Sequence, residues 1–185
     1  MIENVRVHPC DESQYVRPKR ISYVQDGISK RWDMVEVHDS VAVILYHEEK
    51  NALVVVRQFR PPVYLKNSDG FTYELCAGIV DKEKSLLEIV HEEILEECGF
   101  EVPLERIERV TSFYTAVGFA GASQTLYFAR IDDGMKKHNG GGIDVESIEV
   151  VYIDTKEAEA FVLDETKAKT PGLMFGFEWF LKNKR

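Results

Sequence analysis

The chain has 185 residues, of which 44% are apolar, which suits one domain with a substantial core and room for a small appendage. Its formal net charge of −9 argues against a nucleic-acid-binding surface, so an anionic substrate must be met by local arginines or by bound cations. The N-terminus lacks a signal-peptide profile, and no apolar run reaches the roughly 18 residues of a membrane span. Cys76 and Cys98 lie in apolar patterns typical of buried thiols. We therefore expect a cytoplasmic protein.

Residues 1–38 form a separate β-rich section. Three strands are predicted, over Asn4–His8, Ile21–Gln25 and Ile28–Val37. The dipeptide Asp26-Gly27 favours a type I′ turn between the last two strands. So few strands are barely stable alone, so this section must pack against its own domain or against a second subunit. Trp32, beside Arg31, suits stacking on a nucleotide base, and it suits the core of an interface equally well.

Two strongly apolar strands, Ser40–Tyr46 and Ala52–Phe59, are predicted at the centre of a sheet. The second strand carries Arg57 and runs into Arg60-Pro61-Pro62, where the prolines stop strand pairing and leave Arg60 at a sheet edge or cleft. A guanidinium there can meet two phosphate oxygens at once. The alternative is an ordinary surface salt bridge.

A polar loop, Lys66–Gly70, precedes a predicted strand over Phe71–Cys76 and a turn at Ala77-Gly78. A helix is then expected over about Leu86–Cys98, because Ser85 and Glu88 form a capping box and Gly99 is a natural helix stop. Its buried face should carry an apolar residue every four positions, at Leu86, Val90 and Ile94.

Three glutamates of this helix, Glu93, Glu96 and Glu97, are spaced i, i+3 and i+4 and should converge on one small volume. Like charges at such distances raise each other's pKa unless a cation lies among them. Carboxylate oxygens at this density suit a hard divalent ion such as Mg²⁺. The alternative is a solvated acidic helix face.

The remaining chain contributes three strands and two helices, expected over Ile107–Tyr114, Gln124–Ile131, Ile148–Ile153, Thr155–Leu163 and Pro171–Asn183. In the last helix, an apolar stripe favours packing roles for Trp179 and Phe175. The loop 116–123 of small residues should border a pocket. The glycines at 140–142 predict a loop that can swing, bearing Asp144 and Glu146; these two acids are either part of the site or solvated.

The segment from Gly78 to Phe100 resembles the signature box of the Nudix hydrolases. That box reads Gly, five residues, Glu, seven residues, then Arg-Glu-apolar-any-Glu-Glu-any-Gly-apolar. The matching positions are Gly78, Glu93, Ile94, Glu96, Glu97, Gly99 and Phe100. Lys84 stands in place of the family's Glu and Glu92 in place of its Arg, so we expect a charge-reversed pair that preserves their contact.

The resemblance implies an α/β fold with a mixed sheet between helices, the Nudix domain over residues 39–185 and a dimerising β-section over 1–38. It implies Mg²⁺, with Mn²⁺ as a substitute. The metal ligands it implies are Glu93, Glu96, Glu97 and the Ala77 carbonyl, and the catalytic residues are Glu96, Glu97 and Glu146. The substrate-binding candidates are Arg57, Arg60, Trp32, Gly118 and Gln124.

The loop 118–123 and Gln124 resemble the animal UDP-sugar diphosphatases of this family. ADP-ribose-hydrolysing members typically have Pro near Thr115 or Ala116 and Glu at the position of Gln124, and neither is present. The resemblance therefore favours hydrolysis of UDP-glucose by a homodimer. An ADP-ribose diphosphatase and a non-catalytic nucleotide-sugar-binding homologue remain the alternatives.

Overall fold

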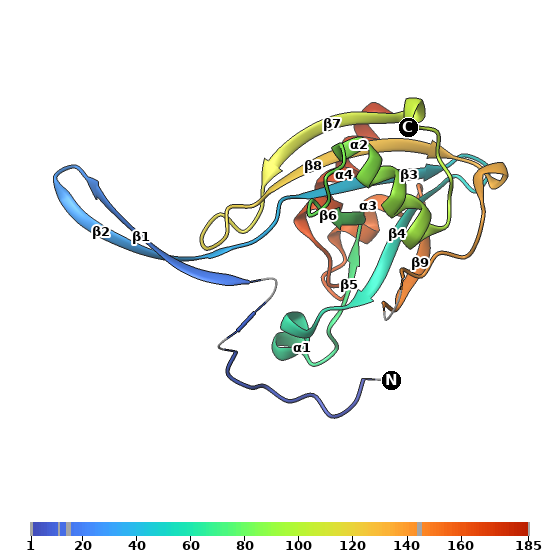
Figure 1. Cartoon of the computed structure of the whole chain (residues 1–185). Coiled ribbons are helices and arrows are strands. Elements are labelled where there is room, and N and C mark those ends of the chain that lie inside the picture. The colour runs from blue at the N-terminus through green and yellow to red at the C-terminus, as the bar shows by residue number, and fades with distance from the viewer. Residues whose placement is uncertain (1, 11, 14–15, 144–145, 185) are drawn as a thin grey trace. The chain divides into compact units, whose positions relative to one another are not determined.

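The computed structural model describes residues 2–10, 12–13, 16–143 and 146–184 (Figure 1). The chain divides into two compact units, residues 1–38 with 114–122 and residues 39–113 with 123–185. Within the described residues, no helix is both long enough and apolar enough to cross a membrane.

The first unit is built on one antiparallel hairpin, β1 (Arg17–Gln25) and β2 (Ile28–Glu36). Asp26 and Gly27 both have positive φ, +54° and +76°, which confirms the predicted type I′ geometry. The Val35 N–H donates to the Phe119 carbonyl at 2.7 Å, which ties the loop 114–122 to β2. The strand expected over Asn4–His8 is wrong: this segment has no regular structure, and none of the described strands pairs with it.

The second unit contains a seven-stranded mixed sheet. Its strands are β3 (Ser40–His47), β4 (Ala52–Phe59), β5 (Phe71–Glu74), β6 (Cys76–Ile79), β7 (Ile107–Tyr114), β8 (Ser123–Ile131) and β9 (Ile148–Asp154). β3 pairs in parallel with β8 along its whole length, and β9 pairs antiparallel with β4. The predicted strand Phe71–Cys76 is thus two strands, interrupted at Leu75.

A fork between β3 and β4 positions the site. The two strands pair only over Leu45–His47 and Ala52–Val54. They then separate, and the segment 71–79 enters the gap, with β5 pairing to β4 and β6 pairing to β3. Ala77 and Gly78 therefore lie in a paired strand, and the turn expected there is wrong.

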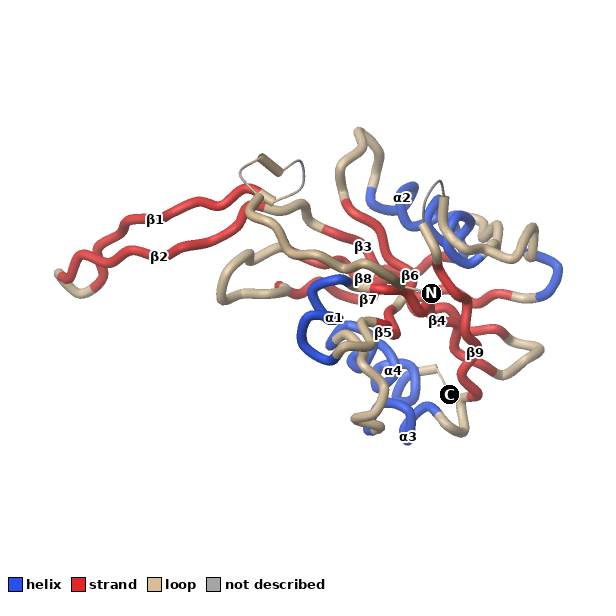
Figure 2. The backbone as a smooth tube through the Cα atoms, turned by 90° about the horizontal axis from the view of Figure 1, so that it is seen from below, coloured by secondary structure: helices blue, strands red, loops and turns tan. Residues whose placement is uncertain are grey.

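Both faces of this sheet are buried, which explains the unbroken apolar runs in the central strands. Val41, Val43 and Leu45 of β3 pack on the face covered by α2 (Leu86–Glu93), whereas Ala42 and Ile44 pack on the face covered by two further helices. Those helices are α3 (Ala158–Leu163) and α4 (Pro171–Asn183). Figure 2 shows α2 on one side of the strands and α3 and α4 on the other, which confirms the expected mixed sheet between helices.

One helix was not predicted, and the bounds of two others differ from the prediction. A short helix, α1 (Pro61–Asn67), follows β4 because its prolines occupy the first helical positions, where no N–H is needed. The helix expected over Thr155–Leu163 begins only at Ala158. The helix expected to continue to Cys98 is α-helical to Glu93 and then widens into a π-helical turn, η1 (Ile94–Cys98). Its capping box at Ser85 and its left-handed Gly99 are as predicted.

Candidate active site

A pocket of about 340 Å³ lies beside the fork of the sheet. It is lined by Ser40, Gln58, Arg60, Glu74, Ala77, Gly78, Ile79, Glu93, Glu97, Gln124 and Glu146. All belong to the second unit. Six of the residues selected from the sequence, the Ala77 backbone and five side chains, thus meet in one pocket.

Glu97 is the most deeply buried acid of the pocket, with 6% of its surface exposed. The Ala77 N–H donates to its Oε2 at 3.0 Å. Burial is the main cause that raises the Glu97 pKa to about 8, and the charges of Glu93 and Glu146 add to it. Glu93 is half-buried, and burial followed by the charge of Glu96 raises its pKa to about 7.

Gly78 makes room for Glu93. An added Cβ at Gly78 would overlap the Glu93 side chain, including its carboxyl group. Because Gly78 does not have positive φ, the absence of a side chain matters here for space and not for backbone conformation. Gly78 therefore allows the Glu93 side chain to pack directly on β6.

Two of the three glutamates expected to converge, Glu93 and Glu97, line the pocket. Glu96 is outside the lining, but its charge acts on Glu93. Residues three apart share a face in an α-helix, and the wider π-helical turn changes that spacing. Among the described residues, the side chains whose ligand atoms all lie within 4.8 Å of one another are instead His47, Glu49 and Asp133.

That second group already contains a cation. The Lys50 Nζ lies 2.5 Å from Asp133 Oδ1 and 3.0 Å from His47 Nε2. The ammonium therefore neutralises the Asp133 carboxylate. These contacts favour a structural ion-pair cluster.

The glycine loop at 140–142 is fixed to the end of the π-helical turn. The Gly141 N–H donates to the Glu97 carbonyl at 2.9 Å, and the Gly142 N–H donates to the Glu96 carbonyl at 3.1 Å. The last carbonyls of a helix lack hydrogen-bond donors within the helix, and the N–H groups of this loop are the donors here. The swinging loop inferred from the glycines is therefore tied by its backbone, and Glu146 beyond it lines the pocket. Asp144 lies outside the described residues.

Arg60 enters the pocket as one half of a two-bond ion pair. Its Nε and NH2 groups donate to Glu74 Oε1 and Oε2, each at 2.8 Å. The Thr72 hydroxyl also donates to Glu74 Oε1, at 2.5 Å. Within the same lining, the Gln124 amide donates to the Ser40 hydroxyl at 3.1 Å.

Three substrate-binding candidates do not line this pocket. Arg57 donates to Glu149 at 3.0 Å and stacks on the Phe71 ring. Trp32 and Gly118 belong to the first unit, where the Trp32 indole N–H donates to the Gly118 carbonyl at 2.8 Å. These contacts provide structural roles for all three.

The charge-reversed pair is present: Lys84 donates to Glu92, and Lys82 lies 3.6 Å from the same carboxylate. This contact joins the loop before α2 to the residue preceding Glu93. It can thereby orient the helix end that carries the acids of the pocket.

We expect Lys84→Glu to lower kcat/KM about threefold or more, because two carboxylates would then face each other beside Glu93. The double variant Lys84→Glu/Glu92→Arg should recover most of this loss, since it restores an ion pair in which position 84 carries the negative charge and position 92 the positive charge. Steady-state kinetics of both single variants and the double variant test the coupling. Strictly additive effects would show that the contact does not matter.

Sequence reasoning missed Glu74, Ser40 and Gln58 as pocket residues. Glu74 had one available signal: it is an acid within an otherwise apolar strand directly before the box. The other two are common polar residues at strand ends, and only the pairing of the strands places them in the pocket.

The charges of the pocket fit a divalent cation. Four carboxylates, those of Glu74, Glu93, Glu97 and Glu146, face a single guanidinium, so the lining carries a net charge of −3 when all are ionised (four minus one). An anionic diphosphate cannot approach such a lining unless positive charge is added. Oxygen ligands of this kind are those that Mg²⁺ and Mn²⁺ prefer.

No family model matches the chain. Uridine diphosphate glucose pyrophosphatase NUDT14 of Bos taurus is 36% identical over 97% of this chain and 94% of its own length. The protein of the same name from Mus musculus is 34% identical over the same shares. A GDP-mannose pyrophosphatase of Cronobacter sakazakii is 35% identical over 66% of this chain and 65% of its own length. The signature residues around one pocket and this similarity along nearly the whole chain lead to one conclusion: the chain belongs to the Nudix hydrolase family.

Proposed function

We propose that this protein hydrolyses the diphosphate of nucleoside diphosphate sugars and that it prefers UDP-glucose, which would yield UMP and glucose 1-phosphate. The observation that carries the proposal is a pocket in which Arg60 faces the acids Glu93, Glu97 and Glu146. The names of the bovine and mouse relatives, which match almost end to end, support UDP-glucose as the substrate.

The proposed cofactor is Mg²⁺, with Mn²⁺ as a substitute. Glu93, Glu97 and the Ala77 carbonyl would hold it, with Glu96 as a further ligand once its side chain turns toward the pocket. A divalent ion supplies charge that neutralises the diphosphate and favours ionisation of water.

The chain's own residues would perform the remaining tasks. Arg60 binds phosphate oxygens through its N–H groups. Glu146 accepts the proton of the water that attacks one phosphorus, and the bridging oxygen leaves with the other phosphate. Gln124 contributes an amide at the wall of the pocket for the sugar or the base. Arg57, Trp32 and Gly118 remain candidates for contacts to the nucleotide.

We also propose a homodimer in the cytoplasm. The β1–β2 register places apolar side chains on one face of the hairpin, namely Ile21, Tyr23, Ile28, Trp32 and Met34. Several of them are exposed, Ile28 by 61% and Trp32 by 54%, which supports burial against a second copy. Light scattering should give twice the chain mass of 21.2 kDa, and a fully active monomer would contradict the dimer.

The buried thiols Cys76 and Cys98 support a reducing compartment.

Turnover of UDP-glucose, GDP-mannose and ADP-ribose at equal concentrations tests the function. We expect UDP-glucose to be hydrolysed at least about tenfold faster than ADP-ribose with Mg²⁺, and none of them to react in EDTA. Mass spectrometry of products formed in oxygen-18 water identifies the phosphorus attacked. Calorimetric binding of UDP-glucose without product formation would contradict the enzyme and favour a binding protein.

A further inference from the structure

Glu74 is a pocket carboxylate for which the proposed chemistry has no use. It lies on β5 with 9% of its surface exposed. A buried carboxylate beside an anion-binding site opposes binding of the anion unless another group neutralises it. Its contacts therefore indicate what it does.

Those contacts orient Arg60. A guanidinium has five N–H donors in one plane. Glu74 accepts the Nε donor and one NH2 donor, both at 2.8 Å. Within the part of the chain that the structure describes, both NH1 donors and the second NH2 donor are left at the end of the side chain, which is the edge that can meet two phosphate oxygens at once.

The backbone of Arg60 and the carboxylate of Glu74 are also held in place. The backbone N–H of Arg60 donates to the Gly70 carbonyl at 2.7 Å, and the Thr72 hydroxyl donates to the Glu74 carboxylate that accepts from the Arg60 guanidinium. Arg60 is the N-cap residue directly before α1, whereas Thr72 and Glu74 lie on β5. Two adjacent elements thus fix the position and the plane of one guanidinium.

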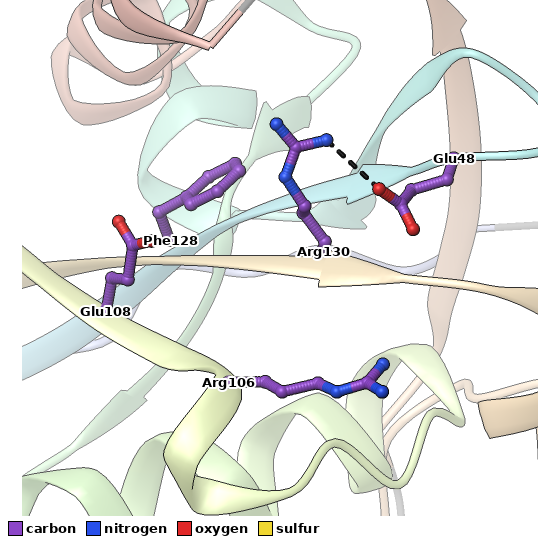
Figure 3. A pocket seen from close by; sticks show the side chains of 5 residues that line it. All are labelled: Glu48, Arg106, Glu108, Phe128 and Arg130. Atoms are coloured by element: carbon purple, nitrogen blue, oxygen red, sulfur yellow. Dashed lines mark hydrogen bonds and ion pairs between the residues drawn. The ribbon is translucent and has the colours of Figure 1, made fainter.

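A second cavity provides a contrast (Figure 3). It measures about 390 Å³ and is lined by Glu48, Arg106, Glu108, Phe128 and Arg130. Its ion pair joins Arg130 to Glu48 through one contact at 3.0 Å, and both side chains are exposed. Exposed pairs of this kind hold a side chain only weakly. The double hydrogen bond to the buried Glu74 is a stronger constraint.

We infer that Glu74 is a positioning residue that presents the outer edge of Arg60 to the diphosphate. This inference rests on the proposed function, because it assigns a role in binding the same substrate. Since the pair Glu74–Arg60 is neutral overall, Arg60 contributes directed hydrogen bonds, and the net positive charge for the diphosphate must come from the cation.

A contact made equally in the bound substrate and in the transition state affects KM and not kcat. Glu74→Gln should therefore raise KM for UDP-glucose about tenfold and leave kcat within about twofold. The Kd for a non-hydrolysable methylene analogue of UDP-glucose, measured by calorimetry with Mg²⁺, should rise by the same factor. Thr72→Val, which removes only the hydroxyl that donates to Glu74, should raise KM and Kd about threefold.

A double-mutant cycle with Arg60→Ala separates positioning from a purely structural role. If Glu74 acts through Arg60, Glu74→Gln should change Kd less than about twofold once Arg60 is absent. Glu48→Gln is the matched control, since it alters a carboxylate that also accepts from an arginine, and it should leave KM and Kd unchanged. Thermal unfolding of each variant confirms that it is folded.

The outcomes are distinguishable. A wild-type protein that neither binds the analogue nor hydrolyses a nucleotide sugar would refute the proposed function. If the wild type does both, an unchanged Kd in Glu74→Gln and Thr72→Val, or equal effects of Glu74→Gln with and without Arg60, would overturn the role of Glu74 alone.

Discussion

Glu97→Gln should lower kcat by about 10²-fold or more and should make the metal-free protein more stable at pH 8. The loss of activity follows because the amide lacks the charge required to hold a divalent ion. The side chain keeps its size and an oxygen that can accept from the Ala77 N–H, so the fold should persist. Steady-state kinetics at saturating Mg²⁺ measure the loss, and retention of half the wild-type rate would refute the assigned site.

The gain in stability follows from the direction of the pKa shift. Burial raises the Glu97 pKa from 4.5 to about 8, so the folded state binds the proton more tightly than the unfolded state. This contribution is fully present below pH 4.5 and is lost as the pH rises through about 8. In EDTA, the Tm of the wild type should fall between pH 5 and pH 8, and the Tm of Glu97→Gln should fall less. Glu83→Gln, on an exposed loop, should follow the wild type.

Gly78→Ala should reduce activity by about tenfold or more and change the Tm little. The new methyl group would overlap the Glu93 side chain, which is flexible and can turn away without moving the backbone. Turning away removes one acid from the pocket. We therefore expect weaker apparent affinity for Mg²⁺, measured by titrating the metal against activity.

Two other glycines provide controls for this variant. At Gly134, an added Cβ would lie 3.1 Å from Oδ1 of the half-buried Asp132, which does not line the pocket, so Gly134→Ala should retain activity. At Gly140, which has φ of +71°, an added Cβ would overlap the Glu97 carbonyl, so Gly140→Ala should lower the Tm. A wild-type metal titration in Gly78→Ala would contradict the packing of Glu93 over this glycine.

Elements with strong local signals could be predicted closely. The bounds of β4, β7 and α4 agree with the sequence analysis because polar turns, prolines or an apolar stripe mark them. The hairpin turn at Asp26-Gly27 and the capping box at Ser85 also depend on residues near each other in the chain. Local physical rules suffice for such features.

Features that depend on distant partners could not be predicted. The interruption at Leu75 arises because β5 and β6 pair with different strands. The π-helical turn is accompanied by hydrogen bonds from the loop 140–142, and Glu96 within this turn is outside the pocket lining. Glu74 acquires a role only when β5 lies beside the start of α1. Each of these depends on tertiary contacts that no local pattern encodes.

The parallel pairing of β3 with β8 has a consequence for synthesis of the protein. Ser40 and Gln124, which share a hydrogen bond in the pocket, are separated by 84 positions in the chain. A nascent chain that has emerged as far as Phe100 contains the whole signature box, yet one edge of β3 has no partner until β8 is made. Such an open, apolar edge is prone to pair with other chains. Cotranslational folding should therefore leave the catalytic centre incomplete until β8 and then Glu146 have emerged, and chains terminated before β8 should aggregate.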